Sequence, residues 1–381
     1  MSESDTAMLL DVARDFVDRR VRPQAQELDE TERFPSEIYD EMAEIGMFGI
    51  TVPEEHGGLS ASHEDFFALM EVLASGYAAV ADQAGLIEMV GGLISQLGTD
   101  QQRKDYLEPL LRGELRCAYC LTEPDAGSDL GSLRSIARPD GDGWRLTGEK
   151  TWINNARIAD FGLVLAITDP DARKRDKMSL FLVDLDREGV ERGPSEHKMG
   201  QRGSVLGNLI FNDVRVEPEE LLGEPGRGFP AIMGALDGGR IAIAGLSLGV
   251  AGRALEVAQS YAAARTSFGR AIEEYQAIAF RLADAVTEIR AAQLLARDAA
   301  RRTAEPGGSA RCSMAKLFAS ETALRVTDLA VQVYGGAGYV RGFEPERLYR
   351  DIRVVTIYEG TSEMQRLVIS RALAQGQPLT R

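Results

Sequence analysis

The spacing of the apolar residues changes twice along the chain, and these two changes constrain its fold more than any other feature. Up to about residue 115, apolar side chains recur near a helical period, as from Met8 to Phe16. Between 118 and 216, short runs of β-forming residues are separated by turn dipeptides, and afterwards the helical period returns in longer stretches. The sequence therefore predicts an α+β chain of several domains: a helical domain at 1–117, a β domain at 118–216 and a helical bundle at 217–381.

The same patterns predict the individual elements. Helices are expected at 36–47, 64–75, 84–97 and 101–112 in the first part, and at 240–264, 272–302 and 310–334 in the last. Strands are expected at 135–138, 144–146, 161–167, 179–183 and 209–211. The last three helices are rich in alanine, which allows helices to pack closely in a bundle.

The composition is typical of a globular protein with an acidic surface. The net charge of −16 argues against nucleic acid or an anionic membrane as the main partner. The chain does not begin like a signal peptide, and its longest apolar stretch, Ile241 to Val250, looks too short and too rich in glycine to span a bilayer. We therefore expect a cytoplasmic protein.

The cysteines and histidines suggest neither a disulfide framework nor a metal site. Cys117 and Cys120 form a CxxC, but it lies in an apolar, strand-like run without the context of a redox motif. The histidines His56, His63 and His197 lack metal-ligand spacing. A reducing compartment and no bound metal are expected.

Two segments of the predicted β domain suit a polar heterocycle with a pyrophosphate. The first begins as a strand and turns through Glu123-Pro-Asp-Ala-Gly127, which places backbone N–H groups, Thr122 and Ser128 around one concavity. In the second, Trp152 and Asn154 lie two residues apart on a predicted strand and so are expected on one face. The indole could cover a ring, and the amide could hydrogen-bond to it.

A third segment, 350–366, centres on the carboxylate of Glu359. An apolar run ending at Tyr358 predicts a strand-like approach, Gly360 allows a positive φ, and Thr361 is a good N-cap for a following helix. A carboxylate held there against apolar neighbours has a raised pKa, as a general base working near neutral pH requires. For an isolated glutamate the simpler interpretation, a solvated turn residue, would prevail.

These segments, together with Arg265-Thr-Ser-Phe-Gly269, Gln276 and Gln332-Val-Tyr-Gly-Gly336, occur in the order seen in acyl-CoA dehydrogenases, which the chain resembles over nearly its whole length. The resemblance implies an N-terminal helical domain, a middle β-barrel or β-sandwich domain and a C-terminal four-helix bundle. It also implies a homotetramer of fatty acid metabolism that binds FAD partly across a subunit interface. The implied partners are an acyl-CoA substrate and an electron-transfer flavoprotein.

The resemblance assigns a role to each motif of this sequence. The residues implied around the flavin ring are Tyr119, Leu121, Thr122, Gly127, Ser128, Trp152, Ile153 and Asn154. Those implied at the diphosphate and adenosine of FAD, some from a neighbouring subunit, are Arg265, Phe268, Gln276, Gln332, Gly335 and Gly336. Thr361 and Glu363 are implied on the cofactor side of the final helix. The implied acyl-CoA contacts are Ser128, Asp237, Arg240 and Gly360.

The chemistry implied is the α,β-dehydrogenation of an acyl-CoA thioester to the trans-2-enoyl-CoA. Glu359 is implied to take the α-proton while the β-hydrogen leaves as hydride to flavin N5. Some relatives carry the base instead at the position of Gly239, which has no side chain here, and this favours Glu359. Three alternatives stay open: a flavin oxidase or monooxygenase of the same fold, a dehydrogenase of carrier-protein thioesters, and a non-catalytic relative.

Three features need separate interpretation. Asn154 stands where many relatives have Thr or Ser beside flavin N5, and its amide is expected to donate there too. In the loop 200–207, Leu206 replaces a hydroxyl residue of the family pattern, so a structural role is expected for Ser204 and its neighbours. Glu88 lies in an apolar stretch of a predicted helix at the floor of the acyl pocket; an exposed residue is favoured, and a partner for a polar acyl group is the alternative.

Two further motifs are discounted. Ser313-Met-Ala-Lys316 has the SxxK spacing of β-lactamases but lacks their companion motifs. Gly336-Ala-Gly338 follows a predicted helix and not a strand, so it is not a dinucleotide-binding fingerprint.

Overall fold

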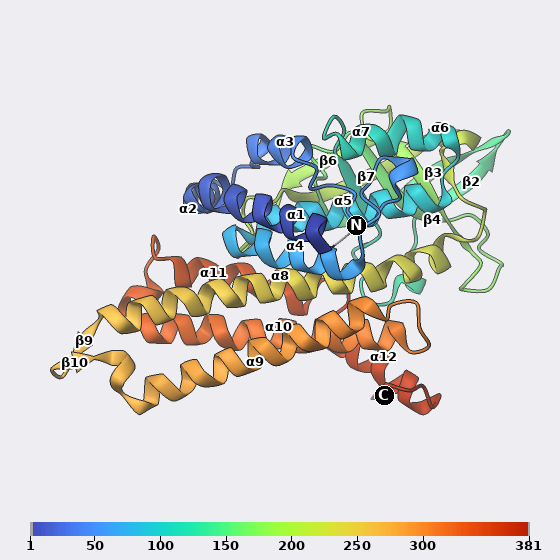
Figure 1. Cartoon of the computed structure of the whole chain (residues 1–381). Coiled ribbons are helices and arrows are strands. Elements are labelled where there is room, and N and C mark those ends of the chain that lie inside the picture. The colour runs from blue at the N-terminus through green and yellow to red at the C-terminus, as the bar shows by residue number, and fades with distance from the viewer. Residues whose placement is uncertain (1–2, 380–381) are drawn as a thin grey trace.

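The computed structural model, which describes residues 3–379, consists of two helical parts and a β-sheet domain (Figure 1). The N-terminal helices and the sheet lie together on one side of the long C-terminal helices, which run the length of the molecule. The predicted fold class is confirmed.

The N-terminal part is built from α1 (Glu3–Phe16), α2 (Arg22–Thr31), α3 (Ser36–Glu44), α4 (His63–Gly76), α5 (Ala78–Leu97), α6 (Asp100–Gln102) and α7 (Glu108–Leu111), with short η1 (Val17–Val21), η2 (Glu54–His56) and η3 (Arg103–Leu107). Ser62 starts α4 with a capping box, in which its hydroxyl accepts from the Asp65 N–H and its own N–H donates to the Asp65 carboxylate. Helix α5 begins before the predicted residue 84, because the preceding alanines are strong helix formers and are buried.

The sheet contains β1 (Cys117–Cys120), β2 (Ile136–Asp140), β3 (Gly143–Asn154), β4 (Phe161–Ile167), β5 (Met178–Asp184), β6 (Val190–Ser195), β7 (Leu206–Val216) and β8 (Leu221–Leu222), with η4 (Leu130–Ser132) and η5 (Pro218–Glu220) between strands. The order is β6-β7-β3-β2-β4-β5-β8, and β1 pairs in parallel with β4. Inward apolar side chains such as Val164, Phe181 and Phe211 form a core of the β domain. Strand β6 was not predicted, because its Val-Glu-Arg-Gly-Pro-Ser sequence carries turn residues and charges.

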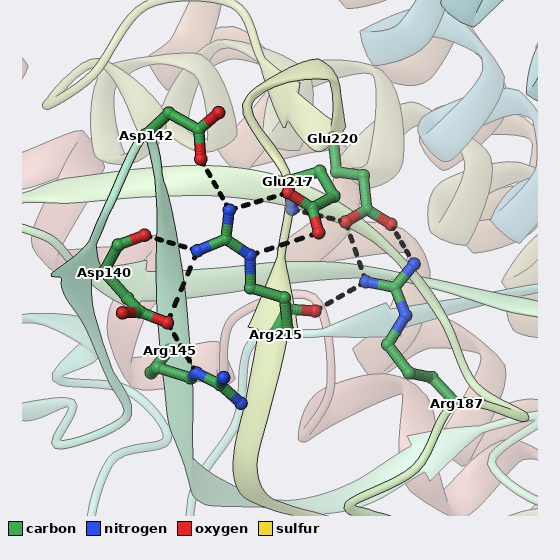
Figure 2. Close-up of polar contacts among 7 residues, drawn as sticks. All are labelled: Asp140, Asp142, Arg145, Arg187, Arg215, Glu217 and Glu220. Carbon is green, nitrogen blue, oxygen red and sulfur yellow. Dashed lines mark hydrogen bonds and ion pairs between the residues drawn. The ribbon is translucent and has the colours of Figure 1, made fainter.

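A network of charges ties the β2–β3 hairpin to the end of β7 and to η5 (Figure 2). Its members are Asp140, Asp142, Arg145, Arg187, Arg215, Glu217 and Glu220. Arg187 donates to both carboxylate oxygens of Glu220, at 2.6 and 2.7 Å, and to the Arg215 carbonyl at 2.6 Å. The chain is thus fastened where it leaves the sheet for the bundle.

The C-terminal part contains α8 (Gly228–Ala264), the hairpin β9 (Thr266–Ser267) and β10 (Arg270–Ala271), η6 (Ile272–Glu274), α9 (Gln276–Arg301), α10 (Gly308–Tyr334), η7 (Gly335–Tyr339), α11 (Glu344–Ile352), η8 (Arg353–Thr356) and α12 (Ser362–Ala374). Helix α8 packs against α4, α5, α9 and α10 and so joins both helical parts.

The predicted start of α8 at residue 240 is wrong. Glycines and Pro230 obscured the helical pattern, but proline is tolerated in a first turn.

Two helices, α5 and α8, are long and apolar enough to cross a membrane by length and composition alone. The expectation that the longest apolar stretch is too short is therefore wrong for the helix that contains Ile241 to Val250. In both helices 83% of the apolar window is buried inside the fold, which is the pattern of core helices.

Candidate active site

Glu359 lies in a sharp turn between η8 and α12. The predicted strand-like approach is wrong, because α11 and η8 carry the chain helically up to Thr356. Contacts with distant segments hold this helix: Arg350 pairs with the buried Asp29 at 2.6 Å, and Asp351 accepts from the Gln201 N–H at 2.5 Å. These tertiary contacts override the strand preference of the β-branched residues.

The turn itself is left-handed at two successive residues. Glu359 has a φ of 53° and Gly360 a φ of 86°. A left-handed conformation costs a non-glycine residue roughly 1–2 kcal/mol, so it persists only where the surroundings fix it. Lys316 Nζ donates to the Gly360 carbonyl at 2.7 Å, and Gln365 Nε2 donates to the same oxygen at 2.8 Å. Thr361 caps α12 by accepting from the Met364 N–H, as predicted.

The carboxylate of Glu359 is directed inward. Although the residue keeps some exposed surface, its Oε2 is buried and has no hydrogen-bond partner among the described residues. A Cβ added to Gly239 of α8 would lie 2.7 Å from this oxygen. Burial raises the pKa of Glu359 to about 7, with a further increase from Asp82, while Lys316 and Arg240 lower it. An unpartnered carboxylate with a pKa near neutrality has the properties of a general base.

Lys316 was not predicted as a site residue, because its SxxK spacing lacks the companion motifs of β-lactamases and its contacts lie far away in the sequence. Its side chain on α10 is fully buried, and burial lowers its pKa to about 8. The charge that remains stabilises the ionised form of Glu359. The available signal was a lysine within the apolar stretch Ala315-Lys-Leu317, since lysine is rarely buried without a partner.

We predict that Lys316→Met shifts the pH dependence of the flavin reduction that the resemblance to acyl-CoA dehydrogenases implies. In the parent protein the rate should rise as pH increases through about 7, because only the ionised Glu359 accepts a proton. Loss of the Lys316 charge should raise the pKa of Glu359 and move this inflection to higher pH. Anaerobic stopped-flow reduction across the neutral range measures it. Lys316→Arg is the matched control, and an unmoved inflection in Lys316→Met would contradict the assignment.

The two predicted flavin-side segments of the β domain lie next to each other. The Thr151 N–H donates to the Thr122 carbonyl at 2.9 Å, which joins the turn after β1 to β3. Lys150 lies beneath this turn, fully buried, and its Nζ donates to the Leu121 carbonyl at 3.2 Å and to Glu123 Oε1 at 2.8 Å. The Gly127 and Ser128 side of the turn is exposed.

Trp152 sits on an irregularity of β3. The register between β3 and β7 shifts between Lys150 and Ile153, and Trp152 has a φ of 53°. This shift interrupts the regular alternation on which the expected shared face of Trp152 and Asn154 depended. The Trp152 side chain is 60% exposed, whereas Leu121 and Ile153 are buried in the protein core. A large indole is thus held uncovered beside the turn.

Asn154 is held by two other segments. Its Nδ2 donates to Asp82 of α5 at 2.6 Å, and its Oδ1 accepts from Ser204 Oγ at 2.8 Å. The loop that contains Ser204 therefore has the structural role that the sequence suggested. Asp82 was missed because nothing near it in the sequence indicates its partner.

Tyr119 and Arg240 of α8 both lie close enough to Glu359 for their charges to interact with it. The hydroxyl of Tyr119 is buried without a hydrogen-bond partner in the described part of the chain, and burial followed by the nearby Glu359 charge raises its pKa. Arg240 is buried, pairs with Asp237 at 2.6 Å and donates to Ser309 at 3.0 Å. The predicted catalytic residue and the predicted substrate-side residues of α8 are therefore brought together.

The remaining predicted cofactor residues lie elsewhere. Tyr261 near the end of α8 stacks on Tyr334 at the end of α10, with ring centroids 4.0 Å apart. Two sets of exposed residues lie near this contact. The first set, after α8, is Arg265, Phe268 and Gln276; the second, at the end of α10, is Gln332, Gly335 and Gly336. Gly239 lies inside α8 and Arg265 is the residue that caps its C-terminal end, so the two are about 39 Å apart along the helix at 1.5 Å per residue. Within one chain, the residues around Arg265 and Gln332 therefore lie far from Glu359. Glu363 is exposed on the first turn of α12.

Glu88 corrects an expectation. It is not exposed: its side chain is buried and accepts from the Ile50 N–H at 2.8 Å and the Thr51 N–H at 2.7 Å. The Thr51 hydroxyl also donates to it. Both carboxylate oxygens are therefore occupied by the loop after α3, and the structure gives Glu88 a role in holding that loop.

The cysteines Cys117, Cys120 and Cys312 are free and buried. Burial raises the pKa of each thiol. Within residues 3–379, no group of three or more His, Cys, Asp or Glu side chains is arranged to hold a metal ion.

Comparisons with known proteins identify relatives along the whole chain. Family models for the N-terminal, middle and C-terminal domains of acyl-CoA dehydrogenase match residues 3–114, 118–214 and 226–374. The chain is 42% identical to the 3-(aryl)acrylate reductase of Clostridium sporogenes, covering 95% of this chain and 96% of that protein. It is 41% identical to the caffeyl-CoA reductase–Etf complex subunit CarC of Acetobacterium woodii, covering 96% and 97%. The structure of butyryl-CoA dehydrogenase from Megasphaera elsdenii matches with a TM-score of 0.94 at 35% identity, covering 98% and 99%.

Proposed function

Because this chain belongs to the acyl-CoA dehydrogenase family, we propose that Glu359 is the base that takes the α-proton of its acyl-CoA substrate. The observation that carries this proposal is the buried Glu359 Oε2, which has no hydrogen-bond partner among residues 3–379 and lies next to Gly239. Its pKa near 7 lets it both accept and release a proton at neutral pH. Lys316 and Gln365 keep the turn rigid, so the carboxylate is already oriented before substrate binds.

The family is FAD-dependent, and the residues around Glu359 fit a flavin. Tyr119 leaves a buried hydroxyl unpaired in the described structure, Trp152 presents a largely uncovered indole, and a Cβ at Gly127 would meet nothing within 4 Å. We propose that the turn after β1 and the bulge of β3 hold the ring. Bound FAD would supply the acceptor for the hydride that leaves the β-carbon. The chain's part is to orient the thioester, exclude water and hold the proton on Glu359.

Purified protein provides the test. We expect a flavin absorbance that bleaches anaerobically when a suitable saturated acyl-CoA is added. Butyryl-CoA and a 3-arylpropionyl-CoA are the first substrates to compare, since one similar protein is named a butyryl-CoA dehydrogenase and another a 3-(aryl)acrylate reductase. A protein that holds no flavin, or flavin that no acyl-CoA bleaches, would contradict the proposal. Peroxide formed on admitting oxygen would favour an oxidase instead.

A second candidate is the same chemistry run in reverse. Both curated relatives described above are named reductases, one of aryl acrylates and one of caffeyl-CoA. In that direction Glu359 would begin protonated and deliver its proton to the α-carbon of an enoyl thioester. Oxidation of the chemically reduced protein by an enoyl-CoA, compared in rate with bleaching by the saturated thioester, separates the two.

We further propose an electron-transfer flavoprotein as the electron partner, in the cytoplasm. One relative is named as part of a complex with such a protein, which supports the partner. Three unpaired cysteines support a reducing compartment. Anaerobic transfer of electrons from reduced protein to an electron-transfer flavoprotein tests the partner.

We also propose a homotetramer in which FAD spans two subunits. The far-end residues, among them Phe268 at 97% exposure, are too distant from Glu359 to serve the same flavin within one chain. They would instead contact the diphosphate and adenosine of FAD bound to a neighbour. This arrangement predicts complementation between two defective variants.

Glu359→Gln subunits and Arg265→Ala subunits should each be poorly active alone, the first through loss of the base and the second through weaker FAD binding. Mixed assemblies made by co-expression should regain activity, because an intact Glu359 then shares a site with an intact Arg265 of the other chain. Activity after mixing is the measurement, and light scattering gives the assembly size. Mixtures no more active than the sum of their parts would contradict a shared site.

A further inference from the structure

Asp82 is a buried carboxylate in an apolar stretch of α5, and the proposed chemistry does not explain it. It is 8% exposed and lies among alanines, where burying an ionised group is costly unless hydrogen bonds or opposite charges compensate it. Asn154 Nδ2 donates to it at 2.6 Å. Burial raises the pKa of Asp82, while the hydrogen bonds from Asn154 and the Tyr358 hydroxyl and the charge of Lys198 lower it. The negative charge of Asp82 also raises the pKa of Glu359, because it disfavours a second negative charge nearby. Asp82 thus stands between the predicted flavin side and the base.

The contact with Asp82 determines how the Asn154 amide is oriented. A primary amide has one carbonyl and two N–H donors. Ser204 Oγ donates to the carbonyl at 2.8 Å, and Asp82 takes one N–H, so one donor is left. Rotating the amide by half a turn would place its carbonyl against the Asp82 carboxylate, which is repulsive. Lys198 stabilises this arrangement by donating to the Ser204 carbonyl.

We propose that Asp82 is a positioning residue for the flavin: it fixes the Asn154 amide with one N–H left for the bound ring, and it places a buried negative charge beside that ring. This proposal rests on the flavin site proposed above. A hydroxyl side chain at position 154 would have a single O–H donor that can rotate, so it would not need such a partner. A fixed negative charge near the ring opposes the build-up of negative charge that accompanies reduction. Asp82 should therefore make the reduced protein a stronger hydride donor, which suits reduction of an enoyl thioester.

The simpler interpretation is that Asp82 only ties α5 to the sheet. The neighbouring Gln83 makes a parallel contact, in which its Oε1 accepts from Asn155 Nδ2 at 2.9 Å. Gln83 is buried on the same helix, but it touches neither Asn154 nor Glu359 in the contacts described above. It therefore supplies a matched control for a purely structural role.

The test is the reduction potential of bound FAD in the full-length holoprotein, measured by anaerobic equilibration with a reference dye. Asp82→Asn keeps the shape and a carbonyl acceptor for Asn154 but removes the charge. We expect the equilibrium constant for two-electron reduction to increase by about tenfold, or about 30 mV. Gln83→Leu should leave the potential unchanged, whatever it does to the free energy of unfolding.

A double-mutant cycle tests whether Asp82 acts on the reduction potential through Asn154. In an Asn154→Thr background, Asp82→Asn should shift the potential less, because the amide that couples the two is absent. An unshifted potential in Asp82→Asn, or an equal shift in Gln83→Leu, would overturn the role of Asp82 while leaving the proposed function intact. A parent protein without flavin would instead overturn both proposals.

Discussion

Replacing Glu359 by Gln is expected to slow reduction of the bound FAD by acyl-CoA by about 10²–10⁴-fold, the usual contribution of a positioned base. The substitution keeps the shape of the side chain but removes its ability to accept a proton. Folding should be little affected, since Glu359 Oε2 has no hydrogen bond to lose within the described residues. Flavin absorbance at equal protein concentration checks that FAD is retained, and anaerobic stopped-flow bleaching gives the rate.

Gly239 offers a control that restores the base from another position. A Cβ at Gly239 would point at the space that Glu359 Oε2 occupies, at 2.7 Å. In a Glu359→Gly background that space is vacant, so Gly239→Glu should recover part of the lost rate. Gly239→Glu alone should be impaired, because two carboxylates would then compete for one buried volume. Bleaching at the parental rate in Glu359→Gln would show that another group takes the proton.

Replacing Lys150 by Met is expected to lower the free energy of unfolding by about 3–5 kcal/mol, the usual cost of breaking a buried ion pair from one side. Lys150 is fully buried and Glu123 nearly so. The three Lys150 contacts, to Glu123, the Leu121 carbonyl and the Leu165 carbonyl, would all be lost. The Glu123 carboxylate would remain buried without its cation and would keep the hydrogen bonds from the Arg134 and Ser135 N–H groups.

The same change should weaken FAD binding, because Lys150 anchors the turn proposed to contact the flavin. Urea denaturation measures the stability, and titration of the apoprotein with FAD measures the affinity. Lys174→Met is the matched control: Lys174 pairs with Asp129 at 2.6 Å, but both side chains are more than half exposed. Exposed pairs contribute about 0–1 kcal/mol. Equal losses in the two variants would contradict the importance assigned to Lys150.

The elements that the sequence predicted best are those whose pattern is set by local burial. Strand β4 was predicted at its observed bounds because all its residues are apolar, and α10 because its buried residues follow a helical period. The approach to Glu359 was mispredicted because Arg350 and Asp351 fix it through contacts with Asp29 and Gln201. Such long-range contacts leave no local pattern.

The candidate site shows the same division. Glu359, Gly360 and Thr361 were predicted because their roles depend on neighbouring residues: a turn, a positive φ and an N-cap. Asp82 and Lys316 were missed because their partners lie far away in the sequence. A charge within an apolar helical stretch was the one local signal for both. At Glu88 that signal was noticed, but it was interpreted as exposure.

The proton step at Glu359 is tested most directly by exchange at the α-carbon of the substrate. The flavin-loaded protein is incubated anaerobically in D₂O with the saturated acyl-CoA that bleaches it best, and deuterium in the recovered thioester is measured by mass spectrometry. We predict α-deuteration by the parent protein, faster as pH rises through about 7, and almost none by Glu359→Gln. Equal deuteration by both proteins would contradict the assignment of Glu359 as the base.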